Sequence, residues 1–145
     1  MRKCARHSIR VYEVFPKLRE RARQDATTMS GGEQHMCAIG RGLMADPRLL
    51  IIDELSLGLS PRPVGELAEA LRRVNQLGVA ILLVEQDVGT ALNLSSRAYV
   101  VDQVRIAQTG PSHMLAGDPP VRAAYMSGVR LQRRCASHSA YASIP

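Results

Sequence analysis

Two short groups of residues in this 145-residue sequence have the types and spacing needed to act on phosphate groups. The first is Ser30-Gly31-Gly32-Glu33, which stands ahead of apolar residues spaced as on one face of a helix. A hydroxyl, two glycines without a Cβ and a helix N-terminus offer donors and a positive dipole end to a phosphate oxygen. An ordinary helix cap with a glycine turn uses the same residue types, so this group alone leaves both interpretations open.

The second group is the acidic pair Asp53-Glu54, which follows the apolar run "LLII". A carboxylate at the end of a buried strand can hold Mg²⁺ through water, and a second one can orient or deprotonate an attacking water. Adjacent carboxylates also occur in plain loops. The order of the two groups is more informative, because the glycine-led helix runs directly into the acidic strand.

The elements that must position these residues alternate along the chain. We expect helices at 32–46, 61–77 and 87–96, strands at 49–52 and 79–86, two short strands within 98–110 and broken helical pieces at 111–126. This alternation predicts an α/β fold with a mainly parallel sheet, which places ligands at the carboxyl ends of its strands. Asp53, Glu54 and Glu85 all fall at such ends, and "LLII" predicts a strand buried on both faces.

Composition narrows the class of protein. Apolar residues make up 46% of the chain, which argues against wholesale disorder, and the length suits one domain. No apolar run approaches the roughly 20 residues needed to cross a bilayer. Cys4, Cys37 and Cys135 are far apart and odd in number, so we expect no disulfide framework or zinc site, and a reducing, cytosolic setting.

The net charge of +6 raises nucleic-acid binding as one alternative function. Residues 1–24 hold eight Lys and Arg against two acids, and residues 128–145 hold three Arg and no acid. The middle, 25–127, holds eight Arg against eleven acids. The positive charge is therefore in the two ends, and we expect no nucleic-acid partner.

Residues 11–127 resemble the back half of the ATP-binding subunit of an ABC transporter. The stretch "MSGGEQ" resembles the family signature, "LLIIDE" the Walker B strand and "SLGL" at 56–59 the D-loop. "ILLVEQD" resembles the switch region, with Gln86 where most of the family has His. These stretches, together with "FPKL" and "GEQHMCAIGRGLM", are most similar to the branch that serves branched-chain amino-acid importers.

The resemblance implies a role for each motif residue. Glu54 would be the catalytic base for the attacking water, Asp53 would help to hold Mg²⁺, and Gln86 would sense the γ-phosphate of ATP in its own subunit. Ser30-Gly31-Gly32-Glu33 would contact the ATP of the opposite subunit, and Gly58 with its neighbours would run along the interface between the subunits. The cofactors implied are therefore ATP and Mg²⁺.

The resemblance also implies partners, a location and a fold. Two such subunits would close head to tail over two ATP molecules and drive transmembrane permease subunits from the cytoplasmic, inner face of the cell membrane. The fold would be a partial P-loop NTPase (RecA-like) parallel sheet with a remnant of the ABC helical subdomain. Residues 1–10 would be an unmatched basic N-terminus, 11–127 the C-terminal part of the ATP-binding domain, and 128–145 a disordered tail.

One part of the family pattern is missing. No Gly-x-x-x-x-Gly-Lys-Ser/Thr run occurs in the 145 residues, and that loop cradles the phosphates of the nucleotide. In the family its strand lies between the strands at 80–85 and 98–102, so its loss predicts two unpaired sheet edges. We therefore expect ATP hydrolysis as the family activity, but no ATP binding or hydrolysis by this chain alone. The alternative is a non-catalytic fragment that donates "MSGG" in trans to a complete ATPase subunit.

Overall fold

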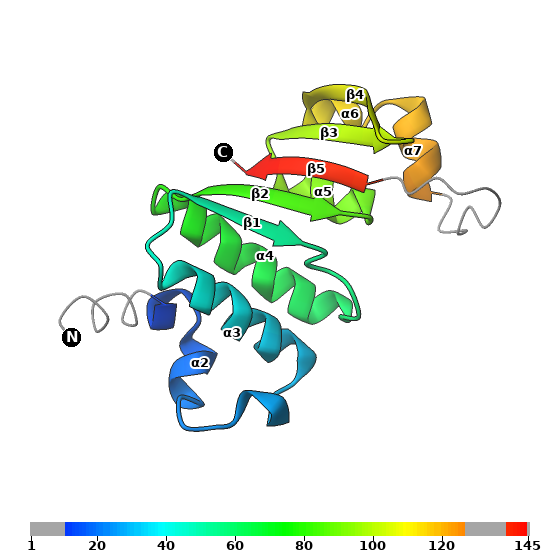
Figure 1. Cartoon of the computed structure of the whole chain (residues 1–145). Helices are drawn as coiled ribbons and strands as arrows, with labels where there is room; N and C mark the ends of the chain where they lie inside the picture. The colour runs from blue at the N-terminus through cyan, green and yellow to red at the C-terminus, as the bar shows by residue number, and fades with distance from the viewer. Residues whose placement is uncertain (1–10, 127–138, 145) are drawn as a thin grey trace. The chain divides into compact units, whose positions relative to one another are not determined.

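A computed structural model describes residues 11–126 and 139–144, the last four residues of the first range and all of the second by their backbone alone (Figure 1). The chain divides into two compact units. The first consists of the described residues within Met1–Leu50 and Leu57–Ala80, and the second of those within Ile51–Ser56 and Ile81–Pro145.

The first unit is helical. Its elements are α2 (Pro16–Glu20), the 3-10 turn η1 (Ala26–Thr28), α3 (Gly31–Leu43) and α4 (Pro61–Gln76). Ser30 caps α3, and Pro61 begins α4, where a missing N–H costs no helical hydrogen bond. The chain leaves α4 through Gly78, whose φ of +89° lies in the left-handed region that favours glycine. The helices predicted from about Gly32 and over 61–77 are confirmed.

The core of the first unit lies along one face of α4. Leu67, Leu71 and Val74 recur at helical spacing, and each is at most 1% exposed. Met36 and Ile39 of α3 are also buried. Burying one such side chain stabilises the fold by about 1.5–3 kcal/mol, so these residues contribute strongly to the stability of the unit.

The second unit is built on a sheet with the strand order β1-β2-β5-β3-β4. The strands are β1 (Leu49–Asp53) and β2 (Ala80–Glu85), which both begin in the first unit, and β3 (Arg97–Asp102), β4 (Arg105–Pro111) and β5 (Ser139–Ile144). Strands β1 and β2 run in the same direction (Figure 1). Strand β5 is antiparallel to both β2 and β3, so β2 and β3 also share one direction.

Three helices complete the second unit. They are α5 (Val88–Leu94), α6 (Ser112–Leu115) and α7 (Pro119–Met126). Together with β3 they supply a small core of Leu92, Ala98, Leu115 and Val121. The two strands expected near Asp102 form the β3–β4 hairpin, whose turn residues Gln103 and Val104 both have positive φ, as a two-residue hairpin turn requires. The α/β fold class is thus confirmed. The sheet is not mainly parallel, however, because β5 pairs antiparallel with β2 and β3, and β4 pairs antiparallel with β3.

The expected disorder of residues 128–145 is wrong for 139–144, which form β5; residues 127–138 lie outside the described part of the chain. The expectation of two unpaired edges is also wrong, because β5 pairs with β2 on one side and β3 on the other. The physical reason is that buried backbone N–H and C=O groups require partners. The stretch "SAYASI" alternates polar or aromatic with aliphatic residues at the period of a strand.

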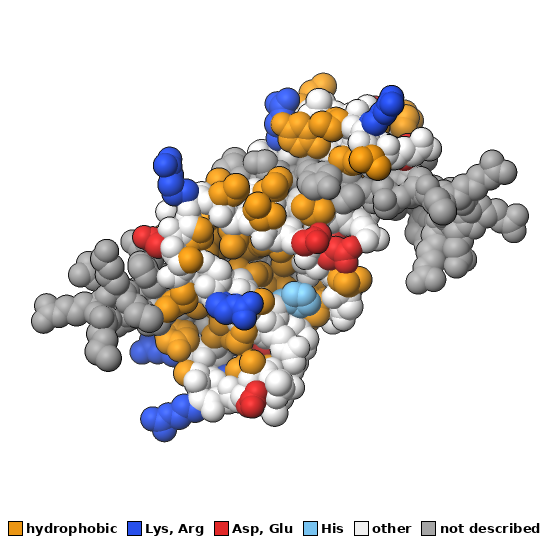
Figure 2. All heavy atoms as spheres, in the orientation of Figure 1, with side chains coloured by type: hydrophobic (Ala, Val, Ile, Leu, Met, Phe, Trp, Pro, Cys, Tyr) orange, Lys and Arg blue, Asp and Glu red, His pale blue; other side chains and the backbone are white. Residues whose placement is uncertain are grey.

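The expectation that "LLII" is buried on both faces is wrong as well. Leu49 and Ile51 of β1 are 51% and 62% exposed, whereas Leu50 and Ile52 are half-buried. Figure 2 shows hydrophobic side chains at the surface over β1 and β2. One face of β1 is therefore uncovered by any residue that the structure describes.

Candidate functional site

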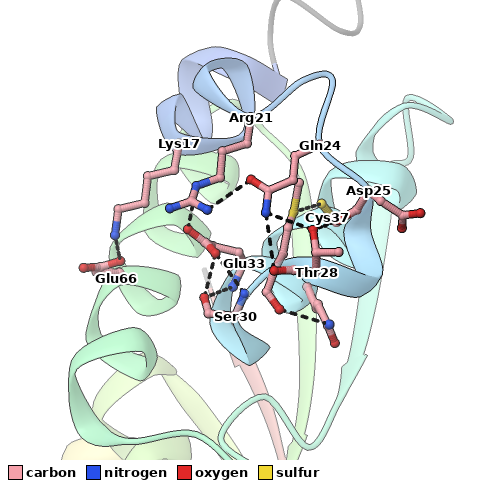
Figure 3. A network of polar contacts seen from close by, with 11 residues as sticks. Lys17, Arg21, Gln24, Asp25, Thr28, Ser30, Glu33, Cys37 and Glu66 are labelled. Carbon is pink, nitrogen blue, oxygen red and sulfur yellow. Dashed lines mark hydrogen bonds and ion pairs between the residues drawn. The ribbon is translucent and has the colours of Figure 1, made fainter.

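The glycine-led turn before α3 is held by a reciprocal pair of contacts between Ser30 and Glu33 (Figure 3). The backbone N–H and the hydroxyl of Ser30 both donate to Oε2 of Glu33, at 2.9 and 2.8 Å. The backbone N–H of Glu33 in turn approaches Oγ of Ser30 at 3.4 Å. This capping box satisfies donors that the first turn of a helix leaves unpaired.

The first unit also surrounds this turn with charged and polar side chains from α2 and the segment after it (Figure 3). Nε of Arg21 lies 3.0 Å from Oε1 of Glu33, and Nη1 of Arg21 donates to Oε1 of Gln24 at 3.1 Å. The amide of Gln24 donates to Oγ1 of Thr28 at 3.0 Å. Spacing in the sequence did not point to the contact between Arg21 and Glu33, because Arg21 lies in a different part of the chain, directly after α2.

The two glycines of the turn differ in what surrounds them. A Cβ on Gly32 would lie 2.8 Å from Cβ of Pro63 in the first turn of α4, which no real pair of atoms tolerates without movement. A Cβ on Gly31 would meet only Cδ2 of Leu59, at 3.3 Å. Gly32 is thus required by the close approach of α3 and α4, whatever else the turn binds.

Acid is expected to weaken the capping box. The pKa of Glu33 is held below its ordinary value, first by the backbone N–H of Ser30, then by the Ser30 hydroxyl, with Arg21 and Lys17 adding to the effect. Because the folded state favours the carboxylate, its contribution is complete above the unfolded pKa of about 4.3 and is lost as the pH falls through the lower folded pKa.

Urea unfolding of the wild-type chain and Glu33→Gln, followed by circular dichroism from about pH 7 to about pH 2.5, measures this contribution. The wild type should be more stable at the upper end, and the difference in unfolding free energy should shrink toward the lower end. A difference that stays constant over this range would contradict the assignment.

The second unit holds the acidic pair. Asp53 ends β1 with an exposed side chain, and Glu54 follows it with a φ of +53°, an uncommon conformation for a residue other than glycine. The backbone N–H of Glu54 donates to the carbonyl of Val84 in β2 at 2.8 Å. The side-chain amide of Gln86 donates to Oε1 of Glu54. The two residues proposed from separate motifs therefore touch.

Sequence reasoning placed Glu85 at a strand end but assigned it no role. Its side chain is only 1% exposed, and its two carboxylate oxygens accept from the backbone N–H and the hydroxyl of Ser56, at 2.8 and 2.9 Å. These bonds tie the residues after Glu54 to the end of β2. A carboxylate in a run of apolar strand residues was the available signal.

The structure thus brings Glu54 and Gln86 together in the second unit, with Asp53 adjacent in the chain, and keeps Ser30-Gly31-Gly32-Glu33 as one turn in the first unit. Among the described residues, no group of three or more His, Cys, Asp or Glu side chains could hold a metal ion. Within the same residues, no helix combines the length and apolar character needed to cross a membrane.

Comparison with known proteins agrees with these motifs. The family model described as "ABC transporter" matches residues 4–56, beginning inside the segment 1–10 that the sequence left unassigned. The chain is 47% identical over 119 residues to BraG of Pseudomonas aeruginosa, a high-affinity branched-chain amino acid transport ATP-binding protein. The chain belongs to the ABC transporter family. It is also 32% identical over 110 residues to LivG of Escherichia coli, which carries the same description.

The matches to these ABC transporter relatives cover most of this chain but only about half of each relative. The BraG match spans 82% of this chain but 51% of BraG, and the LivG match spans 75% of this chain and 43% of LivG. The chain therefore spans about half the length of these curated relatives. A crystal structure of the ADP conformation of an ATP-binding cassette of an ABC transporter superposes with a TM-score of 0.74 at 24% identity, covering 85% of this chain and 50% of that one. This likeness confirms the fold.

Proposed function

We propose that this chain is the C-terminal part of the ATP-binding subunit of an ABC importer for branched-chain amino acids. The observation that carries the proposal is the hydrogen bond from the Gln86 side chain to the carboxylate of Glu54. It couples the motif that would sense a γ-phosphate to the one that would activate water. The similarity to BraG and LivG supports the substrate class, because both are described as branched-chain amino acid transport ATP-binding proteins.

In this proposal Glu54 is the general base that takes a proton from the attacking water, and Gln86 holds and orients its carboxylate. General-base catalysis of this kind accelerates a reaction by about 10²- to 10⁴-fold. The positive φ of Glu54 and its N–H bond to Val84 support the role, because backbone strain concentrates at functional sites. Ser30-Gly31-Gly32-Glu33 would contact the ATP held by a second subunit, offering backbone donors at the start of α3.

When bound, Mg²⁺ would supply positive charge that offsets the negative charge of the ATP phosphates. Asp53 fits a contact through water, since its carboxylate is exposed at the end of β1 beside Glu54. One protein carboxylate suits this ion, because Mg²⁺ keeps several waters and is usually bound through one or two carboxylates and the substrate phosphates.

The proposed partners are a second ATP-binding subunit, arranged head to tail, and transmembrane permease subunits at the cytoplasmic face of the cell membrane. The D-loop residues support a subunit interface. Leu57 is 65% exposed, and the adjacent Gly58 has a φ of +72° with open space around it. The Leu57 side chain is thus accessible to a second subunit, as the resemblance of 56–59 to the D-loop implies.

Two measurements of ATP turnover test the proposal. The purified chain should hydrolyse no ATP, because it has no phosphate-binding loop. ATP turnover by the wild-type chain that is lost in Glu54→Gln would contradict this prediction. A fusion that joins residues 11–127 to the half of BraG proposed to carry the phosphate-binding loop should hydrolyse ATP with Mg²⁺. In that fusion Glu54→Gln should lower turnover at least about 100-fold, whereas Glu69→Gln, an exposed control on α4, should not. Equal effects would exclude the role of Glu54.

A further inference from the structure

We propose that Arg21 is a positioning residue for the turn Ser30-Gly31-Gly32-Glu33, and that it acts on Ser30 through the carboxylate of Glu33. The inference rests on the proposed function, because it takes the turn at Ser30 to contact a phosphate of ATP held by a second subunit. Arg21 lies directly after α2, outside the signature, Walker B, D-loop and switch stretches.

The orientation of Ser30 depends on Glu33. A serine hydroxyl can rotate to suit any partner, but here both the hydroxyl and the backbone N–H of Ser30 point at Oε2 of Glu33. The remaining oxygen, Oε1, faces Arg21 Nε at 3.0 Å. The two oxygens of one carboxylate therefore connect the guanidinium to the serine. A rotation of the Glu33 side chain would disturb its contacts with Arg21 and with Ser30 at the same time.

Arg21 is itself held in place. Its Nη1 donates to Gln24, whose amide donates to the hydroxyl and the carbonyl of Thr28, two residues before Ser30 (Figure 3). The guanidinium is thus fixed on one side by the segment leading into the turn and on the other by Glu33. Lys17, on α2, pairs instead with Glu66 of α4 at 2.5 Å, so it does not compete for the carboxylate.

Charge gives Arg21 a second effect. The Glu33 side chain is only 11% exposed, and it places a negative charge in the turn where backbone donors would meet a phosphate. Like charges this close repel, and a guanidinium paired with the carboxylate offsets that repulsion. Arg21 would therefore both orient Ser30 and make the turn acceptable to an anion.

The structural test uses the full chain with Arg21→Gln, Arg21→Lys and the control Arg72→Gln. Arg72 is 44% exposed like Arg21 and also pairs with a glutamate, Glu69 on the same helix, at 2.6 Å. Carboxyl ¹³C and amide NMR should show a raised Glu33 pKa and a displaced Ser30 amide resonance in Arg21→Gln. Arg21→Lys should restore part of the pKa, and Arg72→Gln should change neither signal. An unchanged Glu33 titration in Arg21→Gln would overturn the proposal.

The functional test measures association of the same chains with BraG loaded with a non-hydrolysable ATP analogue. Arg21→Gln should weaken association about three- to fivefold, the range expected for a partly exposed ion pair, and Arg72→Gln should leave it unchanged. Equal weakening by both variants would overturn the proposal. If the wild-type chain does not bind BraG, the proposed subunit contact fails, and the NMR signals alone decide whether Arg21 positions Ser30.

Discussion

Replacing Gly32 by alanine is expected to destabilise the first unit by about 2 kcal/mol, although alanine is the better helix former. The added Cβ would stand 2.8 Å from Cβ of Pro63 and 3.4 Å from its Cγ. A proline ring in the first turn of α4 cannot rotate away, so the two helices must separate. Separation would loosen the packing around Met36 of α3 and Ala70 of α4, which are buried near this contact.

Two other glycines serve as matched controls. Gly65→Ala adds the same methyl group on α4, where nothing lies within 4 Å, and should stabilise by about 0.5–1 kcal/mol. Gly31→Ala should have a small effect, because the Leu59 side chain can move. Urea unfolding of the three variants measures the differences. A stabilising Gly32→Ala would show that the α3–α4 approach is not as close as described.

Some contacts of the site could be predicted from the sequence and others could not, depending on whether a local pattern or the fold class relates the two residues. The Ser30 cap could be predicted because its partner, Glu33, is in the first turn of the helix that Ser30 caps. The meeting of Glu54 and Gln86 could be predicted because parallel strands end at one edge of a sheet. The contact of Glu33 with Arg21 could not, since no periodicity specifies where a short preceding helix will lie.

Burial explains the other differences. Glu85 looked like one more strand-end acid, yet its carboxylate is enclosed and satisfied by Ser56, which only the folded chain reveals. The run "LLII" suggested a strand buried on both faces, but apolar composition alone does not show whether other elements pack on both faces of the sheet. Strand β5 was missed because its alternation is short and its partners lie far away in the sequence.

Removing residues 139–145 is expected to cost several kcal/mol and to make the chain aggregate. Strand β5 pairs with β2 and with β3 over five positions on each side, and each net hydrogen bond contributes about 0.5–1.5 kcal/mol. A small domain has about 5–15 kcal/mol of stability in total, so this loss is a large share. The open edges of β2 and β3 would also offer unpaired N–H and C=O groups to other chains.

A point substitution tests whether the pairing of β5, and not only the presence of residues 139–145, stabilises the chain. Ala142 lies opposite Leu83 of β2 and Ala98 of β3, in the centre of the sheet. Ala142→Pro removes an N–H and adds a ring in a central strand, so it should destabilise by about 3 kcal/mol or more, whereas Ala142→Ser keeps the N–H and should not. Size-exclusion chromatography with light scattering and thermal unfolding measure both variants and the truncated chain. A truncated chain that stays monomeric and unfolds at the wild-type temperature would show that β5 does not close the sheet. In that case the edges of β2 and β3 would have another source of protection.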